Sequence, residues 1–261
     1  MAIENVLSAG LAHVEIPIRT AGFRSRRGDP PLVTTDSTLA DLRHVDRLLE
    51  QHGVRVCSCT CMSGNPQDEA CVAVMRRKLD LASHFGVKVV VADAGDATDE
   101  EERRLVYSHL AEIGDYAAKL GITVCFETHR GLCVNHREML RVMADLAHPH
   151  LRLNFDTGNI LYYNENIHGE VALAKACHFV KHVHLKDTSG RFGDWNFPAL
   201  GTAGGVDFLR AYQILRDCGF KGPYSIEIEG TAEEPDLPLA EYQQRVIDSV
   251  RYLRTLGYFD G

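Results

Sequence analysis

A repeated unit of one strand and one helix runs along the chain and limits the fold more than any other feature of the sequence. Short runs rich in Val, Ile and Phe alternate with longer stretches whose apolar residues recur with helical period. The centres of the seven predicted strands are Val14, Val56, Val90, Cys125, Phe155, Val183 and Ile226. Successive centres lie 28 to 43 residues apart, which is long enough for one crossover helix between parallel strands.

Glycine follows most of the predicted helices. One helical face is formed by the apolar residues Val106, Leu110, Ile113, Ala117 and Leu120. Gly121 comes next and suits the left-handed position that ends many helices. The same pattern predicts helices over residues 39–52, 70–85, 106–120, 208–218 and 239–256.

This order of elements predicts a parallel sheet covered by helices. The spacing is nearly uniform and no Pro/Ser-rich linker divides the chain, so we expect a single (β/α)8 TIM barrel domain over residues 1–261. Only seven strands are evident. The segment before "LAHVEI" has room for one short helix, so the first strand of the barrel is expected to be missing or irregular.

The charge balance excludes several classes of partner. The chain has 28 Lys and Arg against 36 Asp and Glu, a formal net charge of −8. Binding to nucleic acid or to an anionic membrane surface needs clustered positive charge, so we expect neither. No apolar run approaches the roughly 20 residues that span a bilayer. The first residues do not resemble a secretory leader, which favours a cytoplasmic location.

The eight cysteines do not have the spacing of a structural zinc site or of a disulfide framework. Cys57, Cys59 and Cys61 alternate along one predicted strand, and the others are scattered. We therefore expect the cysteines to be mostly small core residues kept as thiols in a reducing compartment.

Acidic and imidazole side chains occur where the last four predicted strands end. They are Glu127, Asp156, His182, His184, Glu227 and Glu229. Barrel enzymes place their catalytic groups at this end of the strands. Two carboxylates about 4 Å apart repel by about 4 kcal/mol at an effective dielectric of 20, so a counter-charge is needed. Three carboxylates and one imidazole suit a divalent cation such as Mn²⁺, Mg²⁺ or Co²⁺, and Zn²⁺ is also compatible.

Two choices stay open at this point. Alternation along a strand lets His182 and His184 face the same side, so that one is a ligand and the other supports it or contacts substrate. The pattern does not choose between Glu227 and Glu229 either.

Several motifs make the chain similar to a known family. "FETH", "FDTGN", "HVHLKD", "PALGTAGGVDF" and "GPYSIEIE" occur in this order. From about Val54 to the C-terminus the chain resembles the sugar phosphate isomerase/epimerase family of xylose isomerase-like TIM barrels, the group that contains D-tagatose 3-epimerase and inosose dehydratase. The resemblance implies that the metal ligands are Glu127, Asp156, His184 and Glu227.

The resemblance also implies a reaction. The substrate would be a ketose or a keto-cyclitol, and the metal would stabilise the enediolate that forms when a proton leaves carbon. Glu127 and Glu227 would donate and accept the proton on opposite faces. No Gly-rich phosphate loop of the P-loop kind is present, so a phosphorylated substrate is not expected.

Two other reactions are compatible with such a site. An inosose dehydratase-like lyase would use the same enediolate to expel water. An abasic-site metallonuclease is disfavoured, because it would need further His ligands and a basic DNA-facing rim.

Further residues are candidates for substrate contacts. They are Glu15, His129, Asn159, His182, Lys186, Arg191 and Trp195. Asn159 lies where epimerases of the family often have a histidine, which departs from their pattern. The Gly/Pro-rich basic segment 19–37 is expected to form a loop over the site or a contact between protomers of a homodimer or homotetramer.

Overall fold

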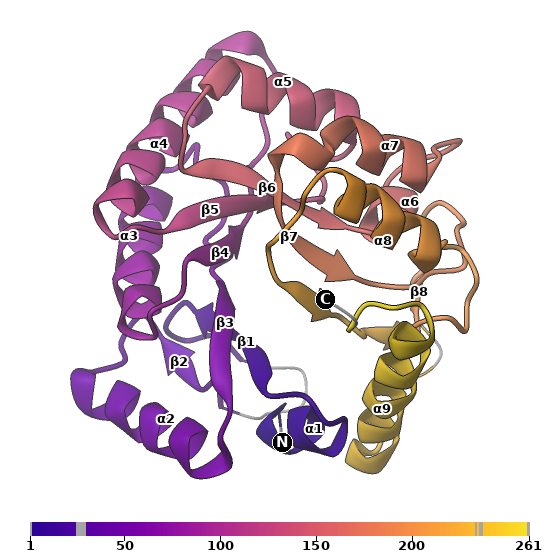
Figure 1. Ribbon diagram of the computed structural model, residues 1–261. Helices are drawn as coiled ribbons and strands as arrows, with labels where there is room; N and C mark the ends of the chain where they lie inside the picture. The colour runs from indigo at the N-terminus through magenta and orange to yellow at the C-terminus, as the bar shows by residue number, and fades with distance from the viewer. Residues whose placement is uncertain (1, 25–29, 233, 235–236, 260–261) are drawn as a thin grey trace.

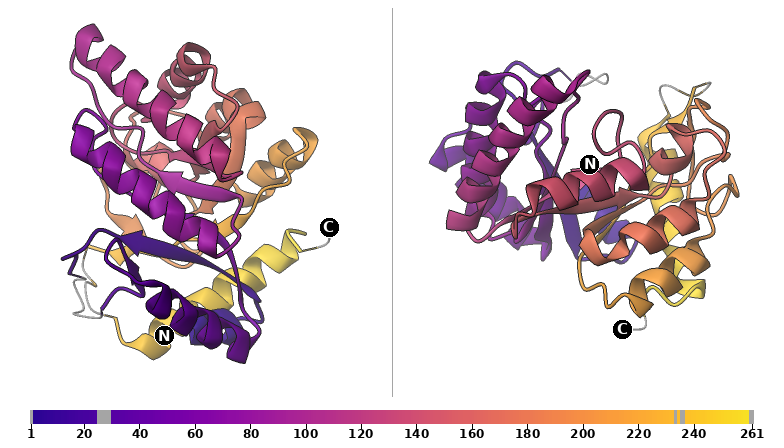
Figure 2. Two further views of the ribbon diagram at one scale, coloured as in Figure 1. Left: turned by 90° about the vertical axis from the view of Figure 1, so that its left-hand side faces the viewer. Right: turned by 90° about the horizontal axis from the view of Figure 1, so that it is seen from above.

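The computed structural model describes residues 2–24, 30–232, 234 and 237–259 and contains one curved parallel sheet with helices around it (Figures 1 and 2). The strands are β1 (His13–Arg19), β2 (Val33–Thr34), β3 (Arg55–Thr60), β4 (Val89–Ala92), β5 (Thr123–Glu127), β6 (Leu151–Asp156), β7 (Val180–Leu185) and β9 (Tyr224–Ile226), in the spatial order β2-β1-β3-β4-β5-β6-β7-β9. All seven predicted strand centres lie in these strands. The predicted (β/α)8 barrel architecture is confirmed by these parallel strands and by the helices around them.

The helices are α1 (Ala2–Ser8), α2 (Leu39–His52), α3 (Glu69–His84), α4 (Glu100–Lys119), α5 (His136–Leu146), α6 (Asn159–Tyr162), α7 (Gly169–Ala176), α8 (Phe208–Asp217) and α9 (Leu239–Thr255). A 3₁₀ turn spans Cys177–Phe179, and a small antiparallel sheet joins β8 (Asn196–Phe197) to β10 (Gly230–Thr231). Gly53, Gly86 and Gly121 have positive φ after their helices, as the sequence predicted. Helix α4 starts earlier than the predicted residue 106, because the Asp99 side chain accepts hydrogen bonds from the Glu101 and Glu102 amides.

The irregular part of the barrel is at β2 and not before β1. Helix α1 precedes β1, and the two-residue strand β2 pairs with its far end through Ile18 and Val33. Pro30 and Pro31 come just before β2 and have no N–H to donate, which keeps this strand short. Residues 25–29 of the predicted loop 19–37 lie outside the described part of the chain.

The sheet has two edges that do not pair. Among the described strands, no hydrogen-bonded ladder joins β9 to β1. Helices α1 and α9 pack against each other beside this seam, so the first and last helices of the described chain lie side by side (Figure 1). The seam is important for the site, because β1 and β9 both send side chains into the barrel.

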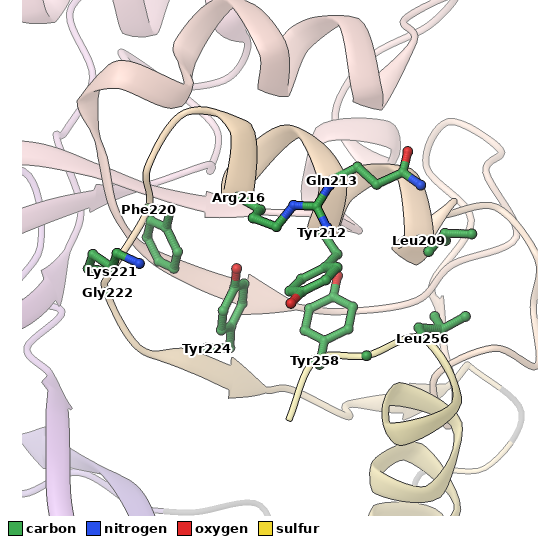
Figure 3. A pocket seen from close by; sticks show the side chains of 11 residues that line it. Leu209, Tyr212, Gln213, Arg216, Phe220, Lys221, Gly222, Tyr224, Leu256 and Tyr258 are labelled. Atoms are coloured by element: carbon green, nitrogen blue, oxygen red, sulfur yellow. The ribbon is translucent and has the colours of Figure 1, made fainter. Parts of the chain in front are cut away.

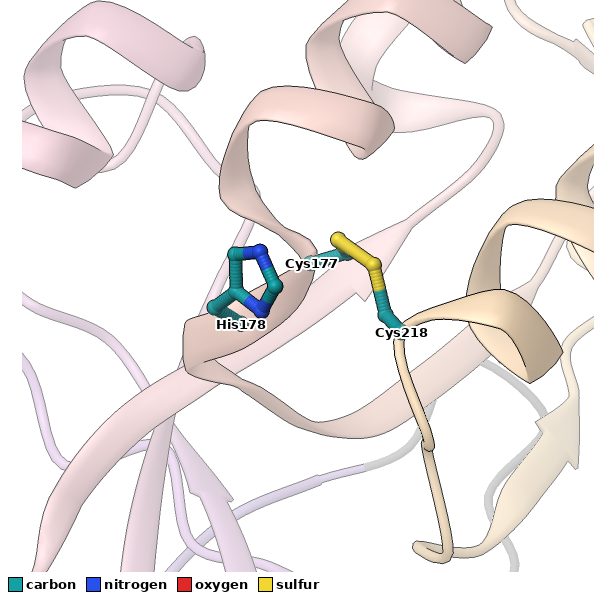
Figure 4. A group of neighbouring side chains, drawn as sticks. All are labelled: Cys177, His178 and Cys218. Carbon is teal, nitrogen blue, oxygen red and sulfur yellow. A yellow bond between two sulfur atoms is a disulfide. The ribbon is translucent and has the colours of Figure 1, made fainter.

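The cysteine prediction is wrong for one pair. Cys177, after α7, and Cys218, after α8, form a disulfide 41 residues apart in sequence (Figure 4). Helices α7 and α8 pack side by side, and this tertiary contact brings the two residues together. The remaining six cysteines are free, and five of them are buried, as expected for small core residues. No helix in the described ranges is long and apolar enough to cross a membrane.

Candidate metal centre

Four side chains from neighbouring strands meet at the carboxyl end of the sheet. Glu127 and Asp156 are the last residues of β5 and β6, His184 lies near the end of β7, and Glu227 directly follows β9. Asp156 is the cross-strand partner of His184, and the Glu227 amide donates to the Leu185 carbonyl. One ligand atom from each of the four lies within 4.8 Å of the others. The strand register therefore brings together the four residues that the resemblance indicated.

His184 faces the carboxylates with one nitrogen. Its Nδ1 lies 3.1 Å from Glu127 Oε1, 3.2 Å from Glu227 Oε2 and 3.9 Å from Asp156 Oδ2. The ring is buried, which lowers its pKa, but the nearby charges of Glu15, Glu227 and Glu127 outweigh burial and raise the pKa well above its usual value.

Lys186 adds a positive charge beside the same cluster. Its ammonium lies 2.8 Å from Glu229, 3.1 Å from Glu227 Oε2 and 3.4 Å from Asp156 Oδ2. Burial raises the pKa of Glu227 by itself, but Lys186 and His184 outweigh it, so the pKa lies below its usual range. Burial dominates at Asp156 and raises the pKa of that carboxyl to about 7.

The pairing of the carboxylate oxygens fits a bound cation. Asp156 Oδ1 accepts hydrogen bonds from the Gly158 and Asn159 amides, both at 2.8 Å, and this turn points Oδ2 into the cluster. Asp156 Oδ2 and Glu227 Oε2 are buried and accept no well-aligned hydrogen bond from any described residue. Three carboxylates and one imidazole nitrogen are suitable ligands for a hard or borderline divalent metal, and two of the carboxylate oxygens accept no well-aligned hydrogen bond from the described residues.

A second group lies deeper in the barrel, below His184. His182 is fully buried, with Nδ1 2.9 Å from Asn154 Oδ1 and Nε2 2.8 Å from Glu15 Oε2. Glu15 Oε1 lies 3.0 Å from Nε2 of His184. Glu15 and His182 are thus separated from the mouth of the site by the His184 ring.

Three other predicted residues line the rim. Asn159 is buried, donates to the Thr128 carbonyl and accepts from Lys186 at 3.3 Å. His129 is half-exposed, with Nε2 2.9 Å from the Tyr163 hydroxyl. Trp195 packs edge-on against Phe197, whose ring lies 4.8 Å from the Lys186 ammonium.

Arg191 does not join this group. Its side chain is 78% exposed and pairs with Asp194 at 3.0 Å. It lies in a loop after β7, and position in a loop gives no direction for a side chain.

The sequence analysis missed two residues beside the site. Asp93 directly follows β4, lies 3.7 Å from His129 Nδ1 and has a pKa raised by burial. Its signal was present, because "VKVVVAD" ends in an acid like the later strands. Tyr163 follows the short helix α6, which the strand pattern does not predict.

A separate cavity of about 710 Å³ lies at the other end of β9 (Figure 3). Tyr212, Phe220, Tyr224 and Tyr258 line it, between α8 and the segment after α9. It contains none of the predicted site residues.

Comparisons with known proteins find relatives with this fold. A family model described as "Xylose isomerase-like TIM barrel" matches residues 3–256. The chain is 30% identical over 206 residues to the L-ribulose-5-phosphate 3-epimerase UlaE of Escherichia coli, covering 72% of this chain and 70% of that protein.

Two solved structures have the same fold. A xylose isomerase domain protein from Planctomyces limnophilus has a TM-score of 0.75 and 18% identity, over 98% of this chain and 91% of that one. A xylose isomerase-like TIM barrel protein from Mycobacterium smegmatis, in complex with magnesium, has a TM-score of 0.74 and 17% identity, over 97% and 86%.

Proposed function

The chain belongs to the xylose isomerase-like TIM barrel family, and from this premise we propose that it is a divalent-metal-dependent isomerase or epimerase of a ketose or keto-cyclitol. The observation that supports the proposal most is the meeting of four ligand side chains, two of whose buried carboxylate oxygens accept no well-aligned hydrogen bond from the described residues. These side chains are Glu127, Asp156, His184 and Glu227. The similarity to a sugar epimerase supports the reaction class.

The metal would be held by Glu127, Asp156, His184 and Glu227, and Mn²⁺, Mg²⁺ or Co²⁺ would suit these ligands, with Zn²⁺ also compatible. When bound, the ion would supply positive charge beside the substrate carbonyl oxygen and so acidify the adjacent C–H. The protein similar in fold that was solved with magnesium supports a hard cation.

The two glutamates would move the proton. Glu127 comes from β5 and Glu227 follows β9, with β6 and β7 between them, so they approach a substrate from different sides. Lys186 and His184 keep Glu227 ionised, which is the form that accepts a proton, and the same positive charges weaken it as a base until substrate and metal change its surroundings. Glu127 would return a proton to the other face. This exchange of faces inverts the carbon and is the step that defines an epimerase.

The rim residues would bind the sugar hydroxyls. His129 and Asn159 lie on the side of Glu127 and Asp156, and Lys186 lies on the side of Glu227. Trp195 would cover the sugar ring from the loop after β7. Glu15 and His182 lie below His184, where a substrate at the mouth would not reach them.

A deuterium-exchange screen tests the proposal. The Mn²⁺-loaded protein is incubated with a panel of ketoses and inososes, free and phosphorylated, in D₂O, and products are read by NMR. We expect deuterium at one carbon together with a new diastereomer. Loss of water from the substrate would instead assign the chain to the dehydratases.

Glu227→Gln is the matched variant, because it preserves the shape of the side chain and removes its basicity. We expect it to abolish exchange. Wild-type rates in this variant would contradict the acid/base assignment.

A further inference from the structure

Glu15 differs from the other acids of the site in that hydrogen-bond donors surround both of its oxygens. Oε1 accepts from the Thr60 hydroxyl and lies 3.0 Å from His184 Nε2. Oε2 accepts from the hydroxyls of Ser58 and Ser225, the latter at 3.0 Å. The side chain is only 13% exposed. A buried carboxylate is stable when its lone pairs are satisfied in this way.

The contact with His184 fixes the ring for a cation. When the Nε2–H donates to Glu15, the other nitrogen, Nδ1, presents its lone pair to Glu127, Asp156 and Glu227. Carboxylates in this position hold metal-binding histidines in one tautomer and orientation.

Glu15, His182 and His184 also lie close enough together to hold a second cation, but the hydrogen bonds argue against it. A metal at Glu15 would have to displace the hydroxyls of Ser58, Thr60 or Ser225 from its oxygens. At the mouth, in contrast, Asp156 Oδ2 and Glu227 Oε2 have no such partners among the described residues.

Glu15 also bridges the seam of the barrel. It lies on β1, before the two residues that pair with the edge strand β2, and Ser225 lies on β9, the edge strand on the other side of the seam (Figure 1). No ladder joins these described strands, so this side-chain bond takes the place of strand pairing. Ser58 and Thr60 connect the same carboxylate to β3, and His182 and His184 connect it to β7.

We propose that Glu15 is a positioning residue that orients His184 for the cation and holds β1 and β9 together across the seam. Glu15 itself binds neither metal nor substrate. This inference rests on the proposed function only for the presence of a cation. The inference links the open seam to the metal site, because the Glu15 carboxylate contacts both His184 and Ser225.

Cobalt titration of the metal-free protein tests this role. Stoichiometry and Kd are measured by calorimetry, and the visible spectrum of bound Co²⁺ reports the ligand field. Wild type should bind one Co²⁺ per chain. Glu15→Gln should bind one Co²⁺ with a Kd about 10- to 100-fold weaker and a shifted spectrum. A purely structural role would leave the spectrum of the bound ion unchanged.

Two variants separate the roles of the two oxygens. Ser225→Ala removes the bond across the seam at Oε2, and we expect a lower melting temperature with a Kd within about threefold of wild type. Thr60→Val removes a donor at Oε1, the oxygen that contacts His184, and should shift the Co²⁺ spectrum even if Glu15→Gln does not fold.

Several results would overturn the inference. Two Co²⁺ per wild-type chain and one in Glu15→Gln would make Glu15 a ligand. An unchanged Kd and spectrum in Glu15→Gln and Thr60→Val would remove the positioning role. Normal Co²⁺ binding by wild type without deuterium exchange on any sugar would contradict the proposed function and leave the role of Glu15 intact.

Discussion

The acids that face the two nitrogens of the His184 ring differ in the hydrogen bonds that their oxygens accept. On the Nδ1 side, Asp156 and Glu227 each keep one buried oxygen without a well-aligned hydrogen bond from the described residues. On the Nε2 side, both oxygens of Glu15 accept hydroxyl hydrogen bonds. The Glu15 side chain is 13% exposed, between Asp156 at 0% and Glu227 at 32%, so exposure alone does not show which acid is available to a ligand. The number of hydrogen bonds that each carboxylate accepts does show which acid is available.

Asp156 and Glu15 also differ in their pKa values. Burial raises the pKa of Asp156 to about 7. At Glu15, burial also acts to raise the pKa, but the charges of His184 and His182 and their hydrogen bonds outweigh it and lower the pKa well below the usual value. Without a metal ion, Asp156 therefore keeps its proton up to about pH 7, whereas Glu15 and Glu227 are ionised at neutral pH because their cationic neighbours lower their pKa.

The largest effect is expected from Glu127→Gln. It removes an acid/base group and a ligand, so kcat should fall by about 10²- to 10⁴-fold. Glu15→Gln should lose activity mainly through weaker metal binding, so saturating Mn²⁺ should restore most of its kcat. The kcat of each variant is measured at increasing Mn²⁺ concentrations. If excess metal rescued Glu127→Gln, the contrast between the two groups would fail.

The pH dependence of the metal-free protein should reveal Asp156. The folded state holds this proton with a pKa of about 7, against 3.8 for the ordinary carboxyl. This stabilisation is complete at low pH and is lost as the pH rises through 7. The free energy of unfolding should therefore fall by about 3 kcal/mol between pH 5 and pH 8.

Urea denaturation in EDTA at the two pH values measures this change. Asp156→Asn should remove most of it, because the amide does not titrate. Glu15 has the opposite sign: its contribution is present above pH 4.5 and is lost as the pH falls through its lowered pKa. Equal pH dependence in wild type and Asp156→Asn would refute the assignment.

Metal should stabilise the folded protein by binding to the site that includes Asp156 Oδ2 and Glu227 Oε2. At a Mn²⁺ concentration of 100 times Kd, the free energy of unfolding should rise by about 2.7 kcal/mol. At one fixed Mn²⁺ concentration the gain should be larger at pH 8 than at pH 6, because Asp156 must release its proton to bind and the Kd is therefore weaker at pH 6. Thermal melting with Mn²⁺ and then EDTA checks this. A melting temperature indifferent to both would show that the four residues hold no ion.

Arg191→Ala is expected to have the smallest effect. The guanidinium is mostly exposed and pairs with Asp194, and exposed pairs contribute about 0–1 kcal/mol. We expect kcat/KM within about twofold of wild type for every substrate accepted in the exchange screen. A tenfold loss would show that Arg191 contacts the substrate, as the sequence predicted.

The sequence predicted well those features that depend on local periodicity. The strands around Val56, Val90 and Cys125 follow from apolar runs, and the helix over 39–52 follows from its stripe and from Gly53. The residues at strand ends could be predicted too, because a parallel barrel puts all of these ends on one side. The resemblance, and not the spacing, chose His184 over His182 and Glu227 over Glu229.

The sequence did not predict contacts between distant segments. The Cys177–Cys218 disulfide depends on the packing of α7 against α8, and the Ser225–Glu15 bond depends on which strands lie at the seam. Glu15 was expected to contact substrate, but it faces the inner side of His184. Depth inside a barrel is not encoded in the alternation of a strand.

The sequence by itself determined the number and order of the main strands, the helices between them, and which acids and imidazoles stand at strand ends. These features depend on local hydrophobic pattern and chain direction. Only the tertiary structure decided which carboxylate oxygens accept hydrogen bonds from neighbouring side chains and which do not. Hydrogen-bond satisfaction is a property of three-dimensional surroundings, and the partners of Glu15 come from three other strands and lie up to 210 residues away in the chain.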